Sequence, residues 1–226
     1  MIIGIISYDY LHLKTEQLVI NFYRNKFVER IKIYALPFKA RKERPVLIPH
    51  RPDMSKGLPT EVLAELDGVE FVRWDGIRNL SHECDVFIIG GAGILDIAFA
   101  DGKPIVNSHP GIIPLTRGLD SFKWAIYNND PIGNTLHLID SETDKGEILA
   151  IEKTPVFSSD SLETLARRHY ELEIDLLSNS LNLISNRISA FYPEKPATMR
   201  MPSKIEAEMV RKFDEYKILF SSKDLK

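Results

Sequence analysis

Residues 104–114 read P-I-V-N-S-H-P-G-I-I-P, and this stretch decides how the chain builds its sheet. The apolar pair Ile105–Val106 is typical of a buried strand, and it passes directly into polar residues before two prolines stiffen the exit. Asn107 and His109 then place two hydrogen-bonding side chains at the carboxyl end of that strand. Because open α/β folds bind their ligands at this edge, the stretch predicts a strand that ends in a binding site.

The chain before this strand alternates between apolar runs and helical patterns. Ile2–Ser7 is continuously apolar, which suits a strand buried on both faces. The same pattern predicts further strands at Ile31–Ala35, Val69–Arg73, Val86–Gly90 and Pro104–Ser108, and helices at Thr15–Arg30 and Pro59–Leu66. Strands that alternate with helices predict an α/β fold with a doubly wound, mostly parallel sheet.

The pattern changes after Gly118. It predicts a helix at Ser121–Asn128, two antiparallel strands at Ile132–Asp140 and Glu147–Val156, a long helix at Ser161–Ile188 and a charged helix at Ser203–Tyr216. Ser158–Ser161 offers capping residues for the long helix. We therefore expect one main domain over residues 1–190 and a helical extension over residues 191–226.

Bulk composition excludes several classes of protein. The chain has 226 residues, 44% of them hydrophobic, and a net charge of −3, which gives no global attraction to nucleic acid or to an anionic membrane. A single cysteine, Cys84, excludes an internal disulfide and a cysteine-based metal site. The first residues do not resemble a signal peptide, and no apolar run is long enough for a membrane helix. We expect a cytoplasmic protein.

A long connection between Leu36 and Leu58 is basic in an otherwise acidic chain. Only Glu43 and Asp53 balance its cationic residues, which are Lys39, Arg41, Lys42, Arg44, His50, Arg51 and Lys56. Long loops inside compact domains are usually functional or mobile. The loop is therefore either a solvated surface segment or a segment that faces phosphate groups over an active site.

Asn107 and His109 have the same strand parity, so both side chains face one side of the sheet. An Asn amide is a neutral donor for a developing oxyanion, and a histidine exchanges a proton near neutral pH. With an aspartate from a later loop, such as Asp144, the set suits acyl transfer without a covalent intermediate. Each residue also has a purely structural interpretation when it is taken singly. His109 could be a structural hydrogen-bond partner, Asp144–Gly146 could form a turn, and His137 could be a half-buried strand residue.

The combined motifs resemble the N10-formyltetrahydrofolate-dependent formyltransferases, whose domain is shared by enzymes of purine synthesis, initiator tRNA formylation and sugar N-formylation. The resemblance covers Val86 to about Pro155, and rests on N-S-H-P-G-I-I-P at 107–114, R-G at 117–118, G-N-T-L-H at 133–137 and D-K-G-E-I at 144–148. It implies a Rossmann-like formyltransferase fold, N10-formyltetrahydrofolate as co-substrate, no metal, and a catalytic trio of Asn107, His109 and Asp144. In that family the Asn and His hold the oxyanion while the His and Asp manage the proton, and His137 supports the site.

The resemblance also implies where the folate lies. Two segments frame its pocket, and their residues are Gly91, Ala92, Gly93, Ile94 and Leu95 in one and Ile139, Asp140, Ser141 and Glu142 in the other. Glycines let the backbone approach a flat pterin, and Ile94 and Leu95 offer apolar walls. The chain lacks the Arg that often precedes the Ile-Leu pair in relatives. A plain glycine-rich turn between a strand and a helix is the alternative.

The resemblance leaves the amine acceptor open. Residues 7–14, S-Y-D-Y-L-H-L-K, lack the glycines of the phosphate loop in the purine enzyme, and too few residues follow the long helix for a tRNA-binding domain. A nucleotide-linked amino sugar remains, such as a 4-amino-4,6-dideoxyhexose of bacterial surface polysaccharide (O-antigen). The residues expected to bind it are Tyr8, Tyr10, Lys39, Arg41, His50, Arg51 and Arg117.

Other functions stay open at this stage. They are formylation of another small amine such as glycinamide ribonucleotide or an ornithine-type amine, hydrolysis of formyltetrahydrofolate, and binding of folate or nucleotide sugar without catalysis. The intact trio argues against the last of these. By resemblance we also expect a homodimer.

Overall fold

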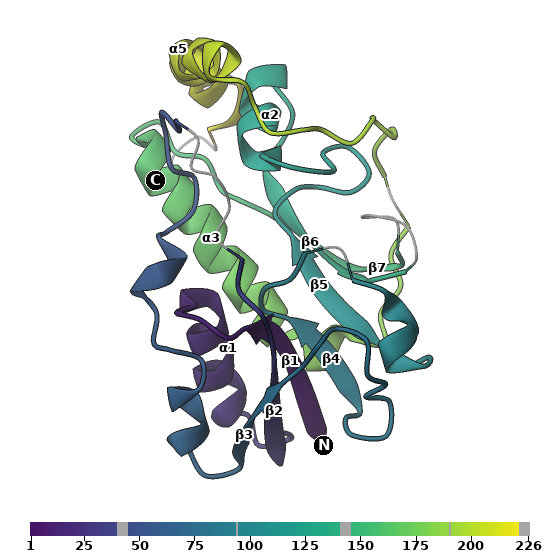
Figure 1. The fold of residues 1–226 in the computed structure, drawn as a ribbon. Coiled ribbons are helices and arrows are strands. Elements are labelled where there is room, and N and C mark those ends of the chain that lie inside the picture. The colour runs from purple at the N-terminus through teal and green to yellow at the C-terminus, as the bar shows by residue number, and fades with distance from the viewer. Residues whose placement is uncertain (40–44, 94, 141–145, 190, 222–226) are drawn as a thin grey trace.

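A central sheet organises the chain in the computed structural model, which describes residues 1–39, 45–93, 95–140, 146–189 and 191–221 (Figure 1). Within these residues the sheet has seven strands in the order β3-β2-β1-β4-β5-β6-β7. They are β1 (Ile2–Tyr8), β2 (Arg30–Leu36), β3 (Val69–Arg73), β4 (Val86–Ile89), β5 (Ile105–His109), β6 (Gly133–Leu138) and β7 (Ile148–Lys153). Strands β1 to β5 pair in parallel, whereas β6 is antiparallel to both of its neighbours. The predicted fold class, a mostly parallel sheet with antiparallel strands, is confirmed.

The described helices differ in length from several predictions. They are α1 (Leu13–Tyr23), α2 (Ser121–Asn128), α3 (Leu162–Ser178), α4 (Ser180–Leu183) and α5 (Ser203–Phe220), with 3₁₀ turns η1 (Met54–Lys56), η2 (Val62–Glu65) and η3 (Ile97–Ala100). The predicted helix at 59–66 is only η2, in which Leu63 is the buried residue, so little tertiary packing supports a longer helix.

Asparagines end two helices earlier than the sequence pattern predicts. The Asn25 side chain accepts from the amide of Phe27 at 3.0 Å, so the predicted helix at 15–30 ends at Tyr23. Asn179 caps α3, and its side chain accepts from Asn182 at 2.6 Å, so the predicted helix at 161–188 is split after Ser178. The Asn25 side chain thus competes for a backbone amide at the helix end, whereas the Asn179 side chain is bonded to another side chain.

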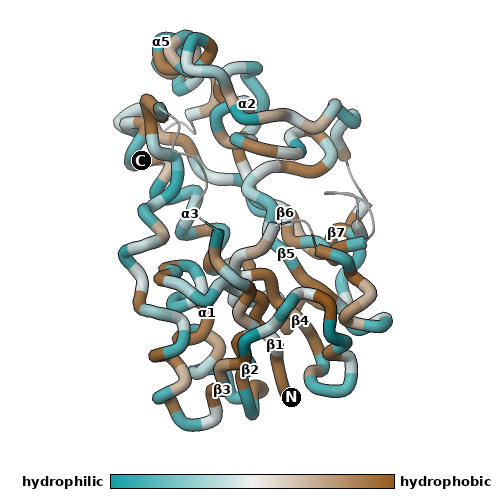
Figure 2. The backbone as a smooth tube through the Cα atoms, viewed as in Figure 1, coloured by the Kyte–Doolittle hydropathy of each residue, from teal (hydrophilic) through white to brown (hydrophobic). Residues whose placement is uncertain are grey.

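The strands alternate between two buried clusters, one on each face of the sheet. On one face Ile3 and Ile5 of β1 pack with α1 and α3, and on the other Ile6 packs with Trp74 and Phe99. Helices α1 and α3 lie side by side on the first face (Figure 1). The apolar strands form the interior, while the connecting loops are mostly hydrophilic (Figure 2). Burial on both faces explains the continuous apolar run of β1 in the sequence.

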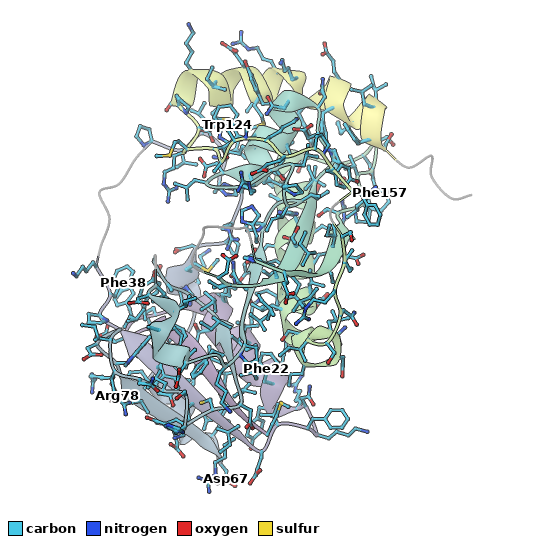
Figure 3. The ribbon with its side chains drawn as sticks, turned by 90° about the vertical axis from the view of Figure 1, so that its right-hand side faces the viewer. Phe22, Phe38, Asp67, Arg78, Trp124 and Phe157 are labelled. Carbon is cyan, nitrogen blue, oxygen red and sulfur yellow. The ribbon has the colours of Figure 1, made fainter. Side chains whose placement is uncertain are left out.

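A third cluster joins α2, the start of α3 and α5, and it includes Phe122 and Met209. The Trp124 indole nitrogen donates to the Met199 carbonyl at 2.8 Å, which ties α2 to the segment before α5 (Figure 3). The end of the chain therefore packs on α2. The domain boundary at residue 190 stays a prediction.

The strand order places a topological switch point between β1 and β4, because the chain leaves β1 toward β2 and returns on its other side at β4. Crevices at such points are the usual ligand sites of open α/β sheets. The carboxyl ends of β1, β4 and β5 meet at this edge, and they carry Tyr8, Gly90 and His109.

Candidate active site

Asn107 lies on β5 directly opposite His137 on β6. The Asn107 amide nitrogen is 3.2 Å from Nε2 of His137, and Nδ1 of His137 is 3.1 Å from the Leu138 carbonyl. Because a carbonyl only accepts, Nδ1 carries the proton and Nε2 accepts from the amide. The hydrogen bond fixes which way the Asn107 amide points, and its second N–H is left to donate elsewhere. His137 is thus a positioning residue for Asn107.

His109, two residues further along β5, is buried and faces the same side of the sheet. Its Nε2 is 2.8 Å from the Thr116 carbonyl and 3.2 Å from the Ser121 hydroxyl. The carbonyl again requires Nε2 to be the donor, so Nδ1 is the nitrogen that exchanges a proton. The Ser121 hydroxyl in turn donates to the Gly118 carbonyl at 3.1 Å. The ring is therefore held in one tautomer.

The loop after β5 is folded tightly around these two side chains. The Thr135 hydroxyl donates to the Gly111 carbonyl at 2.7 Å and accepts from the Ile113 amide at 3.0 Å. A Cβ at Gly111 would lie 2.8 Å from Nε2 of His109 and would also clash with the Thr116 carbonyl, so only glycine fits. The Ile113–Pro114 peptide is cis. β6 thus supplies the contacts that hold the loop in place.

The third member of the predicted trio, Asp144, lies outside the described residues, as do the predicted site residues Arg41, Ile94, Ser141 and Glu142. Residues 140 and 146 flank the segment that carries Asp144, next to the end of β6. Of the trio, the structure brings Asn107 and His109 together. An oriented amide donor and a tautomer-fixed imidazole on one strand end are suited to stabilise negative charge on an oxygen and to move a proton.

The residues predicted to frame a folate follow β4 and β6. Ala92, Leu95 and Ile139 are partly buried and pack on the same apolar cluster. A Cβ built on Gly93 meets no atom within 4 Å, so the backbone there borders open space. An apolar edge beside open space fits the flat ring of a pterin, and Gly91 and Asp140 lie on the same two segments.

Aromatic rings gather at the end of β1. Phe38 stacks on Tyr10 with ring centroids 4.6 Å apart and meets Tyr8 edge-on at 5.7 Å. Tyr8 also meets the His12 ring edge-on at 5.7 Å. Tyr10 and Phe38 are both exposed, at 44% of their surface, and so offer ring faces to a ligand. The sequence prediction named both tyrosines but missed Phe38 and His12.

The basic loop is anchored by a buried carboxylate on α3. Glu173 is 2.5 Å from Arg51 and 2.7 Å from Lys14, whose side chain is only 7% exposed. Burial alone would raise the pKa of the Glu173 carboxyl, but Arg51 and Lys14 outweigh it and hold this pKa at about 2. Burial lowers the pKa of Lys14, while Glu173 opposes the change. The cluster carries two positive charges against one negative charge.

A second set of contacts fixes the loop to α2 and α5. The Glu206 carboxylate accepts from the backbone amides of Leu47 and Ile48 at 3.2 and 3.1 Å, and it pairs with Lys123. His50 lies 3.9 Å from Asp120. Burial, followed by Lys123 and Arg51, lowers the pKa of His50 to about 4. These contacts hold the described part of the loop against the protein.

Two predicted acceptor residues are bound to carboxylates of the chain itself. Arg117 is buried and donates to Glu194 at 2.7 Å and to the Lys195 carbonyl at 3.2 Å. Arg51 pairs with Glu173, although 32% of its side chain is exposed. Lys39 is exposed. A role of these residues in acceptor binding stays a prediction.

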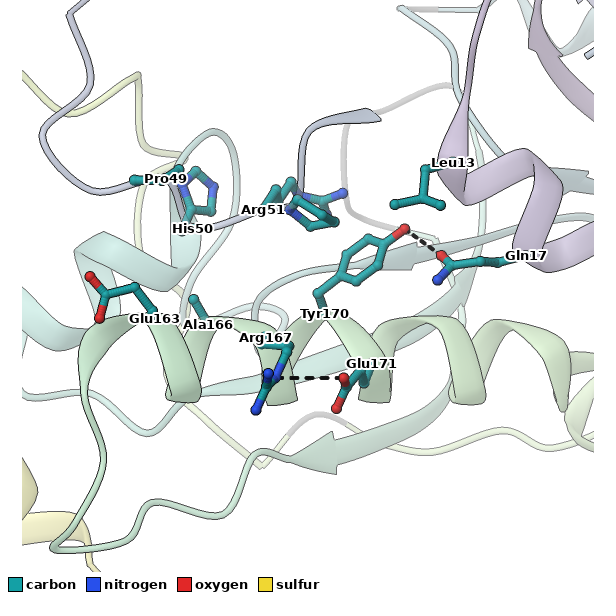
Figure 4. Close-up of a pocket in the computed structure, with 11 residues that line it drawn as sticks. Leu13, Gln17, Pro49, His50, Arg51, Glu163, Ala166, Arg167, Tyr170 and Glu171 are labelled. Carbon is teal, nitrogen blue, oxygen red and sulfur yellow. Dashed lines mark hydrogen bonds and ion pairs between the residues drawn. The ribbon is translucent and has the colours of Figure 1, made fainter. Parts of the chain in front are cut away.

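His50 and Arg51 line a cavity of about 350 Å³ between the loop, α1 and α3 (Figure 4). Leu13, Pro49 and Ala166 contribute apolar walls, and the Tyr170 hydroxyl donates to Gln17 at 2.7 Å at one end. The cavity therefore combines an apolar surface with two nitrogen-bearing side chains from the basic loop. No pattern in the sequence predicted the part that α3 plays, because its lining residues include Ala166 and Tyr170, which read as ordinary core positions.

The sheet order and the polar end of β5 define an α/β protein with a formyltransferase fold. A 4-N formyltransferase from Francisella tularensis has this fold, with a TM-score of 0.58 and 16% identity over 92% of this chain and 86% of the other. Residues 94–181 match the family described as formyl transferase. Over this segment the chain is similar to the formyltransferase family.

Curated relatives fall into two groups. The chain is 30% identical over 118 residues to dTDP-4-amino-4,6-dideoxyglucose formyltransferase of Mycobacterium bovis. The aligned residues cover 52% of this chain and 50% of that protein. It is 36% identical over 73 residues to phosphoribosylglycinamide formyltransferase of Haemophilus influenzae. That alignment covers 32% of this chain and 34% of that protein. The chain spans from a tenth to half of the length of the first curated relatives that it matches.

The described residues contain neither a metal-binding cluster nor a membrane-spanning helix. No group of three or more His, Cys, Asp or Glu side chains among them is placed to hold a metal ion. None of their helices has the length and apolar character that crossing a bilayer requires.

Proposed function

We propose that this chain is an N-formyltransferase that moves the formyl group of N10-formyltetrahydrofolate to the amine of a nucleotide-linked amino sugar. The observation that carries the proposal is the Asn107–His109 pair, oriented by β6 and the following loop, within the segment that matches the family. The bound donor supplies an electrophilic formyl carbon, and Ala92, Gly93 and Leu95 fit its pterin. A 4-amino-4,6-dideoxyhexose for O-antigen synthesis, a cytoplasmic location and a homodimer are further parts of the proposal.

The chemistry assigned to this chain uses two fixed groups. The free N–H of the Asn107 amide donates to the formyl oxygen as negative charge develops on it, and the amide needs no reorientation because His137 already holds it. The acceptor amine attacks the formyl carbon, and the bond from that carbon to the folate nitrogen breaks. The amine gives up a proton, and the protonated His109 ring donates one through Nδ1 to the departing folate nitrogen, since Nε2 is engaged with Thr116. Asp144 is proposed to favour the protonated ring, by resemblance to the family.

Three features support an amino sugar with a nucleotide as the acceptor. Tyr10 and Phe38 expose a stacked pair of rings that suits a nucleobase. Arg51 and Lys14 exceed the charge of Glu173, which suits a diphosphate nearby. The relative from Mycobacterium bovis acts on dTDP-4-amino-4,6-dideoxyglucose by its name.

A panel of acceptors tests the proposal. The protein is incubated with N10-formyltetrahydrofolate and each of the dTDP-, GDP- and UDP-linked 4-amino-4,6-dideoxyhexoses, and the products are weighed by mass spectrometry. We expect one formyl unit on one sugar, and no formate release when the acceptor is omitted. The His109→Asn variant is the matched control and transfers nothing. Formate release without an acceptor would instead identify a hydrolase.

Glycinamide ribonucleotide is a second candidate acceptor. It is favoured by the 36% identity to the phosphoribosylglycinamide enzyme of Haemophilus influenzae. Against it, the turn between β1 and α1 has no glycine to bring backbone amides close to a phosphate. The same panel includes this ribonucleotide, and its formylation with no reaction of any sugar would replace the first candidate.

A further inference from the structure

His12 occupies the switch point of the sheet, between the ends of β1 and β4. A Cβ built on Gly91 would lie 2.7 Å from Cε1 of His12 and 3.0 Å from its Nε2, so the ring rests on the Gly91 backbone. Only 9% of the residue is exposed, and Tyr8 meets the ring edge-on. A nearly buried histidine at the expected ligand crevice has no part in the chemistry assigned to β5.

A chain of hydroxyl groups fixes the proton on this ring. Ser7 and Thr15 hydroxyl oxygens are 2.5 Å apart, and the Thr15 oxygen is 2.7 Å from Nδ1 of His12. Ser7 is fully buried, and among the described residues its hydroxyl bonds only to Thr15. If Thr15 donated to Ser7, the Ser7 proton would have no acceptor, which is costly in a buried site. Ser7 therefore donates to Thr15, and Thr15 donates to Nδ1.

The other ring nitrogen, Nε2, consequently carries the hydrogen. No group in the described part of the chain accepts from it. The ring stays neutral, because burial, followed by the nearby Lys14 and Arg51 charges, lowers the pKa of His12 to about 4. At neutral pH His12 is therefore a fixed donor with one N–H, and it cannot act as an acceptor.

We propose that His12 is a specificity-determining residue, whose Nε2–H donates to an oxygen atom of the amine acceptor at the switch point. This inference rests on the proposed function, and it adds a recognition contact on the side of β1. The oxygen belongs to either a sugar hydroxyl or a phosphate. A fixed buried donor disfavours any molecule that leaves it without an acceptor, by about 10- to 100-fold in affinity.

Steady-state kinetics with a matched pair of variants tests the contact. His12→Leu removes the donor, and we expect kcat/KM for the sugar acceptor to fall about 10- to 100-fold through KM, with KM for the folate unchanged. His12→Gln places an amide N–H near the position of Nε2 and recovers part of that loss. A 2-deoxy or 3-deoxy acceptor and a nucleoside monophosphate competitor distinguish a hydroxyl from a phosphate oxygen. Both variants are checked for folding by urea denaturation.

Histidine ¹⁵N spectroscopy gives a readout that does not depend on turnover. At pH 7 we expect Nε2 of His12 to be protonated and Nδ1 not, and Thr15→Val to mix the tautomers while Thr15→Ser preserves them. Adding dTDP-4-amino-4,6-dideoxyglucose, or whichever acceptor the panel selects, shifts the Nε2 resonance. A proton on Nδ1, or a wild-type KM in His12→Leu, overturns the inference. A wild-type chain that formylates nothing overturns the proposed function, while the tautomer still decides whether His12 is a fixed donor.

Discussion

Replacing Glu173 by Gln tests whether the buried carboxylate holds the loop, α1 and α3 together. The variant keeps the shape but removes the negative charge between Lys14 and Arg51. Lys14 is only 7% exposed and cannot regain water, whereas Arg51, at 32%, can turn outward. Leaving one buried charge without its partner costs about 3–5 kcal/mol of the free energy of unfolding.

The assay is equilibrium unfolding in urea. With a slope of about 2 kcal/mol per molar urea, the midpoint of Glu173→Gln falls by about 2 M. The control is the double variant Lys14→Met with Glu173→Met, which removes both charges and is expected to unfold within about 2 kcal/mol of the native chain. A loss under about 1 kcal/mol in the single variant, or a double variant as unstable as the sum of its singles, would refute the reasoning.

Three further predictions concern Asn107, His109 and the buried histidines. Asn107→Ala is expected to lower kcat by about 10²- to 10³-fold with little change in either KM, because it removes a donor to the developing oxyanion. A fall in folate affinity with an unchanged kcat would contradict this. His109→Asn is expected to abolish transfer while folate binding, followed by calorimetry, stays near the native value; unchanged turnover would remove the imidazole from the mechanism. Burial comes first among the causes that lower the pKa values of His12, His50 and His169, to about 4, 4 and 3. Between about pH 6.5 and 4 the unfolded chain therefore binds protons that the folded chain does not. The free energy of unfolding falls as pH drops through this range, by up to about 4 kcal/mol per pH unit. A urea midpoint that stays constant between about pH 6.5 and 4.5 would contradict this.

The sheet was largely predictable because its signals are local. The strands at Val69–Arg73 and Ile105–His109 are apolar runs between turn residues, and each was placed within one residue. Helix ends were less predictable. Asn25 and Asn179 end their helices through side-chain contacts that the apolar periodicity does not carry.

The shared face of Asn107 and His109 was predictable from strand parity. Their catalytic role stays a prediction. What the sequence did not indicate is how each group is oriented. Thr135 and Thr116 hold the loop after β5 through bonds across the sheet and within the turn, and such residues look ordinary in a strand or loop pattern. The charges of the basic loop were evident, but the carboxylates that hold the loop lie more than a hundred residues away in the chain. Glu173 of α3 pairs with Arg51, and Glu206 of α5 accepts from the backbone amide of Leu47.

The order of the strands places the groups assigned to chemistry and the groups assigned to acceptor binding in different halves of one sheet. Groups assigned to chemistry stand on β5 and are steadied by β6, whereas the rings and charges assigned to the acceptor stand around β1, α1 and the basic loop. In the strand order of the described residues, β4 lies between β1 and β5 and so separates the two sets. Under the proposed function, mutations around β1, α1 and the basic loop would alter the choice of amine acceptor while leaving Asn107 and His109 in place, which makes the amino-terminal half the place to engineer altered substrate choice.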